Sequence, residues 1–494
     1  MEEYRSGIIF GFILVYMLVC IAVGLWAMRR TRSTKDFFMA GRHLGMIVTS
    51  VAVFSSTMSG FGFVGGPGLV YLAGTSSFWM VINMSIGMCI MFFLLGKRLR
   101  LFAELREPVS LPDAVSARYN SRFTGGLTAV AILLGVVTYL GVQIKAMSVV
   151  LFQILQDIPW ASTPLEWCYV ISCAVLVFYC VTGGIIASVY TDLIQGVIMV
   201  VAAVLVLLTT MATIDGGLQG MAEVITRDDP EAMQPWGTFG MISCLSFYFI
   251  MALGVCGQPH VITKLMMTKN ISDTRHMLPM SVAGYGLAAL LWISIGLCMR
   301  AVVLNATHGT PLLNPDQAAS EFLTHFAHPV LAGVVFAGLF AAIMSTADSF
   351  LNIGSAALVH DLPQAFGMTP FKHELRWARM ATAVIAVGAG SLAYYAGEMV
   401  AMLGVMGWSI FAIAIVPIVA IGFNWKRANR IAANTSVISG LVCYAGLYLT
   451  GIRLPYNFHP GAFSMLVTLT IFFLVALVTP ANRLDKDIDA VMDL

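Results

Sequence analysis

Long apolar segments recur along the whole 494-residue sequence, and they restrict its possible folds more than any other feature. Each is about 20 residues long, which is the length that an α-helix needs to cross the hydrocarbon core of a bilayer. Charged residues make up only 11% of the chain, against about 25% in an average soluble domain. Because only helices and closed barrels satisfy every backbone polar group in lipid, the sequence predicts an all-α polytopic membrane protein.

The apolar segments predict about thirteen transmembrane helices in a single integral membrane domain, residues 1–494. Their approximate ranges are 8–28, 45–73, 77–96, 124–155, 165–182, 186–212, 238–258, 278–304, 329–359, 378–395, 399–423, 434–451 and 462–480. We expect two core repeats, at about 45–212 and 238–423. Three helices, at 8–28, 434–451 and 462–480, are expected to be peripheral.

The distribution of basic residues predicts the orientation of the chain. If the N-terminus is outside, most of the 27 lysine and arginine residues fall in loops on one face, Lys264 and Lys269 among them. Cytoplasmic loops of membrane proteins carry an excess of Lys and Arg. We therefore expect a multi-pass protein of the plasma (inner) membrane, with its N-terminus outside and its C-terminus in the cytoplasm.

Two of the predicted spans are rich in glycine at corresponding places. The second contains SSTMSGFGFVGGPG (55–68), and the seventh ends in ALGVCGQP (252–259). Gly and Pro favour helix breaks, which are tolerated at membrane depth only where they line a cavity or are buried in protein. Broken helices 2 and 7, each the first of five spans, indicate a 5+5 inverted-repeat transporter core. Glycines that let neighbouring helices pack closely are the alternative explanation.

Polar side chains interrupt the ninth predicted span in the stretch AAIMSTADSFLN (341–352). At helical spacing, one stripe carries Ala342, Ser345, Thr346 and Ser349. Asp348 lies on a second face, with Asn352. Hydroxyl oxygens on one stripe suit a hard cation, although they could also bond to their own preceding turn or to a neighbouring helix.

Two more charged residues fall inside predicted spans. Asp192 lies in the cytoplasmic half of the sixth span, at a depth where it could meet Thr346 and Ser349. A structural ion pair, or a position at the inner interface, is the alternative for Asp192. Lys145, in the fourth span, could extend to the interface, pair with a carboxylate or bind an anionic substrate group.

The sequence contains no nucleophile–base set, phosphate-binding loop or metal-spaced histidine cluster, so we do not expect an enzyme. Nothing in it indicates a nucleic-acid partner or an obligate protein partner. The expected partners are a small-molecule substrate, sodium and membrane lipid.

Five stretches carry a family resemblance. They are FFMAGRHLG (37–45), SSTMSG (55–60), GGIIASVYTDLIQG (183–196), GQPHVITKLM (257–266) and AAIMSTADSFLN (341–352). Together they resemble the sodium:solute symporter family, and most of all its sodium/proline symporter-like branch, over essentially the whole chain. Thr57 departs from the proline-type pattern, which has an acidic residue at this position, and this leaves the substrate open.

The resemblance implies sodium as the bound ion and the only metal. One site would lie between the broken second span and the ninth span. Its ligands would be the carbonyl oxygens of Ser55, Met58 and Ala342 and the hydroxyls of Ser345 and Thr346. A second sodium site, nearer the inner face, would be formed by Asp192, Ser345, Thr346 and Ser349.

The expected function is sodium-coupled secondary active symport of a small organic solute into the cell, such as an amino acid like proline or a small carboxylate. The solute is expected to bind at the membrane midplane. Candidate binding residues are Phe61, Gly62, Lys145, Phe247, Tyr248, Met251 and Gly254. The alternatives are a proton-coupled symporter of the same fold, with Asp192 or Asp348 carrying the proton, and a channel or sensor built on a transporter-like fold.

Overall fold

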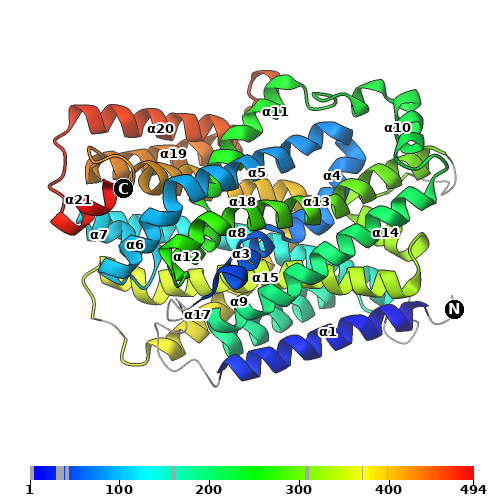
Figure 1. Cartoon of the computed structure of the whole chain (residues 1–494), viewed down its shortest axis with the longest axis horizontal. Coiled ribbons are helices and arrows are strands. Elements are labelled where there is room, and N and C mark those ends of the chain that lie inside the picture. Colours follow the sequence, from blue (N-terminus) through cyan, green and yellow to red (C-terminus); the bar gives the residue numbers. More distant parts are fainter. Residues whose placement is uncertain are drawn as a thin grey trace.

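The chain forms a bundle of long helices that run alongside one another (Figure 1). This computed structural model describes residues 5–28, 38, 44–156, 162–305, 311–369, 371–397 and 399–493. The motif at 37–45 falls mostly outside these residues. Within them, the regular structure is helical, apart from one isolated bridge between Leu44 and Thr268. α1 (Arg5–Met28) begins at one end of the bundle and α21 (Lys486–Met492) lies at the other end (Figure 1).

The first half of the chain contains most of the first predicted repeat. After α1 come α3 (Met46–Thr57), α4 (Gly66–Ala73), α5 (Phe78–Met91), α6 (Lys97–Arg106), α7 (Leu111–Tyr119), α8 (Arg122–Gln156), α9 (Leu165–Thr213) and α10 (Gly217–Asp228). α9 covers both the fifth and the sixth predicted spans. Its part Ser188–Thr213 is long and apolar enough to cross a membrane, and Leu165–Phe178 is a shorter apolar helix.

The second half of the chain contains the helices of the second predicted repeat and the last two long helices. It contains α11 (Met241–Phe247), α12 (Pro259–Met267), α13 (Thr274–Leu304), α14 (Ala318–His325), α15 (Pro329–Ala356), α16 (Leu362–Ala365), α17 (Glu374–Tyr395), α18 (Val400–Ile415), α19 (Arg430–Thr450), α20 (Pro460–Val478) and α21. In the described part of the chain, ten helical segments are long and apolar enough to span a membrane, by length and composition alone. The prediction of an all-α polytopic membrane protein is confirmed, whereas the number thirteen stays a prediction.

The second predicted span is broken near its middle. α3 ends at Thr57, and Met58 takes an extended backbone conformation (φ −87°, ψ 121°). The helix resumes at Gly60 and continues through a π-helical turn, Phe61–Gly65, into α4. The glycine-rich sequence therefore produces a break, as predicted, and the carbonyl groups of the last turn of α3 point beyond a helix end.

The seventh predicted span is broken at the corresponding place. α11 continues through a π-helical turn, Tyr248–Ala252, and a 3₁₀ turn, Leu253–Gly257. Gln258 is then extended (φ −79°, ψ 106°), and Pro259 begins α12. Proline suits the first turn of a helix because its missing N–H would have no partner there. Both predicted breaks are confirmed.

Burial separates the centre of the bundle from its edge. The spans Pro329–Ala365 and Val400–Ile421 are 83% and 89% buried, whereas Arg5–Trp26 is 28% buried. α19 and α20, at 33% and 39%, are also among the least buried spans, but the predicted core span Ser188–Thr213 has the same 39%, so the peripheral position of the three helices stays a prediction. The boundaries of the two repeats stay a prediction.

The C-terminal segment is held against the bundle by ion pairs at one end of it. Arg106, the last residue of α6, contacts the carboxylates of Asp485 and Asp487, each at 2.5 Å. Lys426 lies 2.7 Å from Asp489 and 2.7 Å from Asp493. These contacts, which we call the C-terminal clamp, hold α21 against the end of the bundle that also carries α6 and α7 (Figure 1).

Candidate sodium and substrate sites

Two hydroxyl groups in the middle of α15 face the break in the second span. Ser345 and Thr346 are fully buried, and each donates a hydrogen bond to the Ala342 carbonyl one turn earlier, at 3.0 and 3.2 Å. The Ser345 hydroxyl also lies 3.5 Å from the carbonyl oxygen of Ser55, and that of Thr346 lies 3.0 Å from the carbonyl oxygen of Met58. These hydroxyls therefore bond within their own helix and also reach across to α3.

The five groups predicted as sodium ligands thus form one compact cluster, which we call the cradle. It consists of the carbonyl oxygens of Ser55, Met58 and Ala342 and the hydroxyls of Ser345 and Thr346. All five are neutral oxygens, the type of ligand that hard cations prefer. The Ser55 hydroxyl is also buried, and it has no hydrogen-bond partner among the described residues. A buried oxygen without a partner is costly, so the residues present fit a small bound cation.

Asp192 forms a buried ion pair with Lys264. The Lys264 ammonium lies 2.7 Å from the Asp192 carboxylate, and the two side chains are 1% and 0% exposed. The sequence placed Lys264 in a cytoplasmic loop, and this prediction was wrong. The seventh span does not end at Gln258. After the break there, the chain continues as α12, and Lys264 of this helix lies in the protein interior. The ion pair that was considered as an alternative for Asp192 is therefore present.

The residues predicted for a second sodium site contact two different sets of neighbours. Asp192 is held by Lys264 and by the Ser56 hydroxyl, which lies 3.5 Å from its carboxylate. The Ser349 hydroxyl donates to the Ser345 carbonyl at 3.1 Å and lies 3.4 Å from the Ser188 hydroxyl. A second sodium site at these residues stays a prediction.

Asp348 connects two of the predicted spans. Its carboxylate accepts a hydrogen bond from Ser188 of α9 at 2.8 Å, and another from the neighbouring Ser349 at 3.4 Å. The polar stretch of α15 therefore has two faces, as its periodicity predicted. One face, with Ser345 and Thr346, points to the α3 break, and the other attaches α15 to α9.

A small cavity lies between the two broken spans and the surrounding helices. Its volume is about 10 Å³, close to the space that a single water molecule needs, so the cavity is nearly closed in this conformation. Its wall is mainly aromatic and sulfur-containing. The aromatic residues are Phe61, Tyr139, Tyr285, Trp292 and Trp408. Among the described residues that line the cavity, none carries a charge.

Three of the predicted substrate residues line this cavity, namely Phe61, Gly62 and Met251. Gly254 lies behind it, since a Cβ atom there would come within 2.9 Å of the Trp408 Nε1 atom. Lys145 lies elsewhere, with its ammonium 3.3 Å from the Ala396 carbonyl, between α17 and α18.

The other two predicted substrate residues pack against rings outside the cavity. Phe247 packs against His459, with ring centroids 6.2 Å apart. Tyr248 packs against Phe249 at 5.9 Å and is 36% exposed. Neither residue belongs to the lining of the cavity.

The sequence missed most of the aromatic wall. Tyr139 comes from α8, Tyr285 and Trp292 from α13, and Trp408 from α18. These helices are unbroken where they meet the cavity, so no helix break marks the positions. The sequence offered one signal, the polar hydroxyl of Tyr139 inside an apolar span. Tyr139 shares a hydrogen bond with the Ser59 hydroxyl at 3.0 Å, right at the α3 break.

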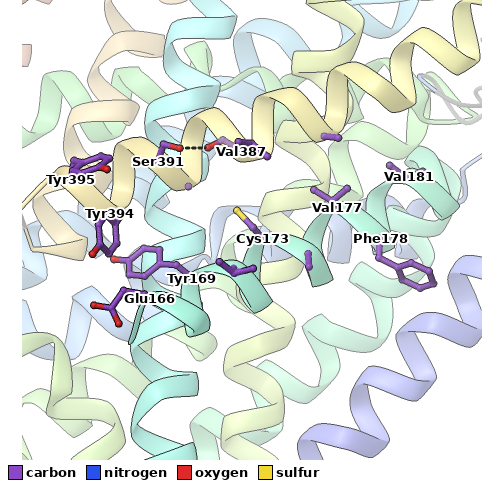
Figure 2. A pocket seen from close by; sticks show the side chains of 14 residues that line it. Glu166, Tyr169, Cys173, Val177, Phe178, Val181, Val387, Ser391, Tyr394 and Tyr395 are labelled. Atoms are coloured by element: carbon purple, nitrogen blue, oxygen red, sulfur yellow. Dashed lines mark hydrogen bonds between the residues drawn. The ribbon is translucent and has the colours of Figure 1, made fainter. Parts of the chain in front are cut away.

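A larger groove lies between α9 and α17 and shares no lining residue with the cavity. Its volume is about 930 Å³, and its wall is apolar along most of its length. Tyr169 and Cys173 project into it from α9, opposite Val387 and Tyr394 of α17 (Figure 2). We interpret this groove as a face of the bundle that contacts lipid, because it offers few polar groups to an organic solute.

Comparisons with known proteins agree with this geometry. The profile of the sodium:solute symporter family matches residues 37–440. The osmoregulated proline transporter OpuE of Bacillus subtilis is 26% identical over 471 residues, covering 94% of each chain. The sodium/proline symporter of Staphylococcus aureus is 26% identical over 511 residues, covering 98% of this chain and 95% of the relative.

Two solved structures share the fold. One is a sodium-coupled sialic acid symporter in a substrate-bound outward-open state, with a TM-score of 0.80, 18% identity and coverage of 97% of this chain and 99% of that one. The other is a nucleobase-cation-symport-1 family transporter in a closed conformation, with a TM-score of 0.60, 14% identity and coverage of 92% and 98%. With the family profile matching most of its length, the chain belongs to the sodium:solute symporter family, and its function is the sodium-coupled symport of a small solute.

Proposed function

We propose that this protein carries a small amino acid such as proline, or a small carboxylate, into the cell together with sodium bound in the cradle. The observation that carries the proposal is the position of Met58. Its carbonyl oxygen belongs to the cradle, 3.0 Å from the Thr346 hydroxyl, while the residue also lines the cavity. A cation in the cradle would therefore fix the same residue that a solute in the cavity touches.

This shared residue suggests how the two binding events are coupled. Sodium would hold the end of α3 against α15 and so favour one arrangement of the broken span. A solute that prefers this arrangement would bind more tightly when sodium is present, and by linkage sodium would bind more tightly when the solute is present. Release of both on the inner side would follow when the contact between α3 and α15 loosens.

The lining of the cavity favours an amino acid over a simple carboxylate. A zwitterion has no net charge, and none of the described residues that line the cavity carries a charge to balance an anion. The indole N–H groups of Trp292 and Trp408 are buried without a hydrogen-bond partner among the described residues, so they could serve as donors to a carboxylate group. The two relatives named for proline point the same way. Thr57, which lines the cavity, stands where the proline-type pattern has an acidic residue, so small solutes other than proline stay candidates.

We also propose that the N-terminus is outside and the C-terminus in the cytoplasm, in the plasma (inner) membrane. The support is the charge of the end that carries α6, α7 and α21, where Arg106 and Lys426 lie in the C-terminal clamp. Accessibility of single cysteines, introduced at the two ends of a cysteine-free variant, to a membrane-impermeant thiol reagent in intact cells would test this orientation.

Uptake by the purified protein in proteoliposomes tests the proposed function. An inward sodium gradient should drive accumulation of labelled proline, or of another solute from a panel of small amino acids and carboxylates. The same vesicles with a pH step and no sodium should not accumulate it. Accumulation driven by the pH step alone would favour the proton-coupled alternative, and currents far above turnover rates would favour a channel.

A further inference from the structure

The ammonium group of Lys264 has three oxygen partners in the protein interior. It donates to the Asp192 carboxylate at 2.7 Å, to the Ala52 carbonyl at 3.2 Å, and to the Ser56 hydroxyl. A lysine ammonium has three N–H donors, so every donor is used. The group is therefore a monovalent cation in a complete oxygen shell, attached to the chain by its own side chain.

This bound ammonium lies next to the cradle. Ser56 connects them, because its hydroxyl contacts both members of the ion pair and its carbonyl oxygen lies 3.4 Å from the Thr346 hydroxyl. Asp192 is also the one carboxylate among the residues predicted for a second sodium site. An ammonium and a sodium ion would therefore compete for the single negative charge of this carboxylate.

We propose that the Lys264 ammonium is a resident cation that takes the place of a second sodium ion at Asp192, so that each solute enters with one sodium ion. The proposal rests on the proposed sodium cradle. The ammonium contacts Oδ2 of Asp192 and already balances its charge, whereas Oδ1 has no hydrogen-bond partner among the described residues. A sodium ion at Oδ1 would place two cations against one buried carboxylate unless it displaced the ammonium. The displaced ammonium would stay buried without a counter-charge, which is strongly unfavourable. The cradle itself contains only neutral oxygens and keeps its own ion.

Removal of the ammonium should open the second site. In Lys264→Met, the Asp192 carboxylate stays buried without a cation, and sodium can replace the missing charge. In Asp192→Asn/Lys264→Met, both charges are gone and no cation is needed there. The matched control is Lys269→Met, which removes an exposed lysine just beyond the end of α12.

The experiment counts sodium ions with ²²Na⁺ binding to the full-length protein in detergent, without any solute. We expect one sodium ion per protein for the wild type, for Lys269→Met and for the double variant, and two for Lys264→Met. Thermal unfolding gives a second reading. In Lys264→Met, replacing choline chloride by sodium chloride should raise the Tm by several degrees more than in the wild type or in the double variant.

Two sodium ions per wild-type protein would overturn the proposal, and so would a single ion in a folded Lys264→Met protein. If Lys264→Met cannot be purified, the wild type and the double variant still test the proposal. A sodium ion bound to Asp192 in the wild type would be absent from the double variant, so the number of bound ions would fall from two to one. One further result would contradict the proposed cradle but not the resident ammonium. No sodium in the wild type with one ion in Lys264→Met would contradict the cradle and still support the resident ammonium.

Discussion

At the scale of single residues, two hydroxyl groups define the cradle. Ser345→Ala or Thr346→Ala should raise the sodium concentration for half-maximal uptake about tenfold or more, because a bond to a charged group contributes about 1.5–3 kcal/mol. The measurement is initial uptake against sodium concentration. Ser355→Ala is the control, since it removes a buried hydroxyl that bonds within α15, to Asn352, away from the cradle. Equal sodium dependence in all three variants would contradict the assignment.

The indole N–H of Trp408 gives a second prediction at this scale. Trp408→Phe keeps an aromatic ring in the cavity wall but removes a donor that has no described partner. If the donor binds the solute, KM for the solute should rise about fivefold to tenfold, the effect of losing one hydrogen bond of about 1 kcal/mol. Trp425→Phe, which changes an indole packed against Phe473, should leave KM unchanged. An unchanged KM in both variants would exclude this donor.

Residue periodicity identified the polar face of α15 but not the burial of Lys264. Ser345 and Thr346 could be found because their spacing puts both on one face of a long, unbroken helix. The burial of Lys264 could not, because it depends on how a nine-residue helix packs after a break. A short helix that carries a lysine looks the same in sequence whether it turns into the protein or out to the cytoplasm.

At the scale of helices, the break in the second span depends on a close approach of backbone to α8. A Cβ atom on Gly60 would come 2.6 Å from the Ala146 Cβ, while the Gly60 N–H donates to the Gln143 side chain at 2.8 Å. Gly60→Ala should therefore push the broken span away from α8, with a cost of about 1–3 kcal/mol.

Two measurements check the Gly60→Ala prediction. Uptake should fall at least tenfold, and the Tm in detergent should decrease. Gly286→Ala in α13 is the matched control, since nothing lies within 4 Å of the added methyl group there. Wild-type uptake by Gly60→Ala would show that the break tolerates displacement and is not coupled to transport.

The C-terminal clamp predicts a pH effect. The hydrogen bond from the Arg106 side chain holds the pKa of Asp487 below its usual range, so this carboxylate stays charged down to more acidic pH in the folded protein. A lowered pKa contributes stability above the unfolded value of about 3.9, and this is lost as the pH falls through the folded value. The protection factors of the amides in 486–492, which correct for the intrinsic pH dependence of exchange, should therefore be high at pH 7 and low near pH 3. In Arg106→Ala they should be lower than in the wild type at pH 7.

At the scale of the whole molecule, the sequence predicted an all-helical membrane protein and the places where two of its spans break. Apolar length and clustered Gly and Pro are local signals, and the energetics of lipid make them reliable. The cavity wall could not be predicted in this way. Tyr139, Trp292 and Trp408 come from three different helices, and only the packing of those helices puts them around one space.

The buried pair of Lys264 and Asp192 sets a limit on how far the cell can concentrate its solute. A carrier with one mobile cation gains about 2.3 kcal/mol from a membrane potential of 100 mV. A tenfold sodium gradient adds about 1.4 kcal/mol. Together they can hold a neutral solute inside at roughly 500 times its outside concentration. A second mobile sodium ion would square this ratio. A cell that relies on this carrier therefore reaches a lower ratio of inside to outside solute but spends one sodium ion fewer per molecule taken up.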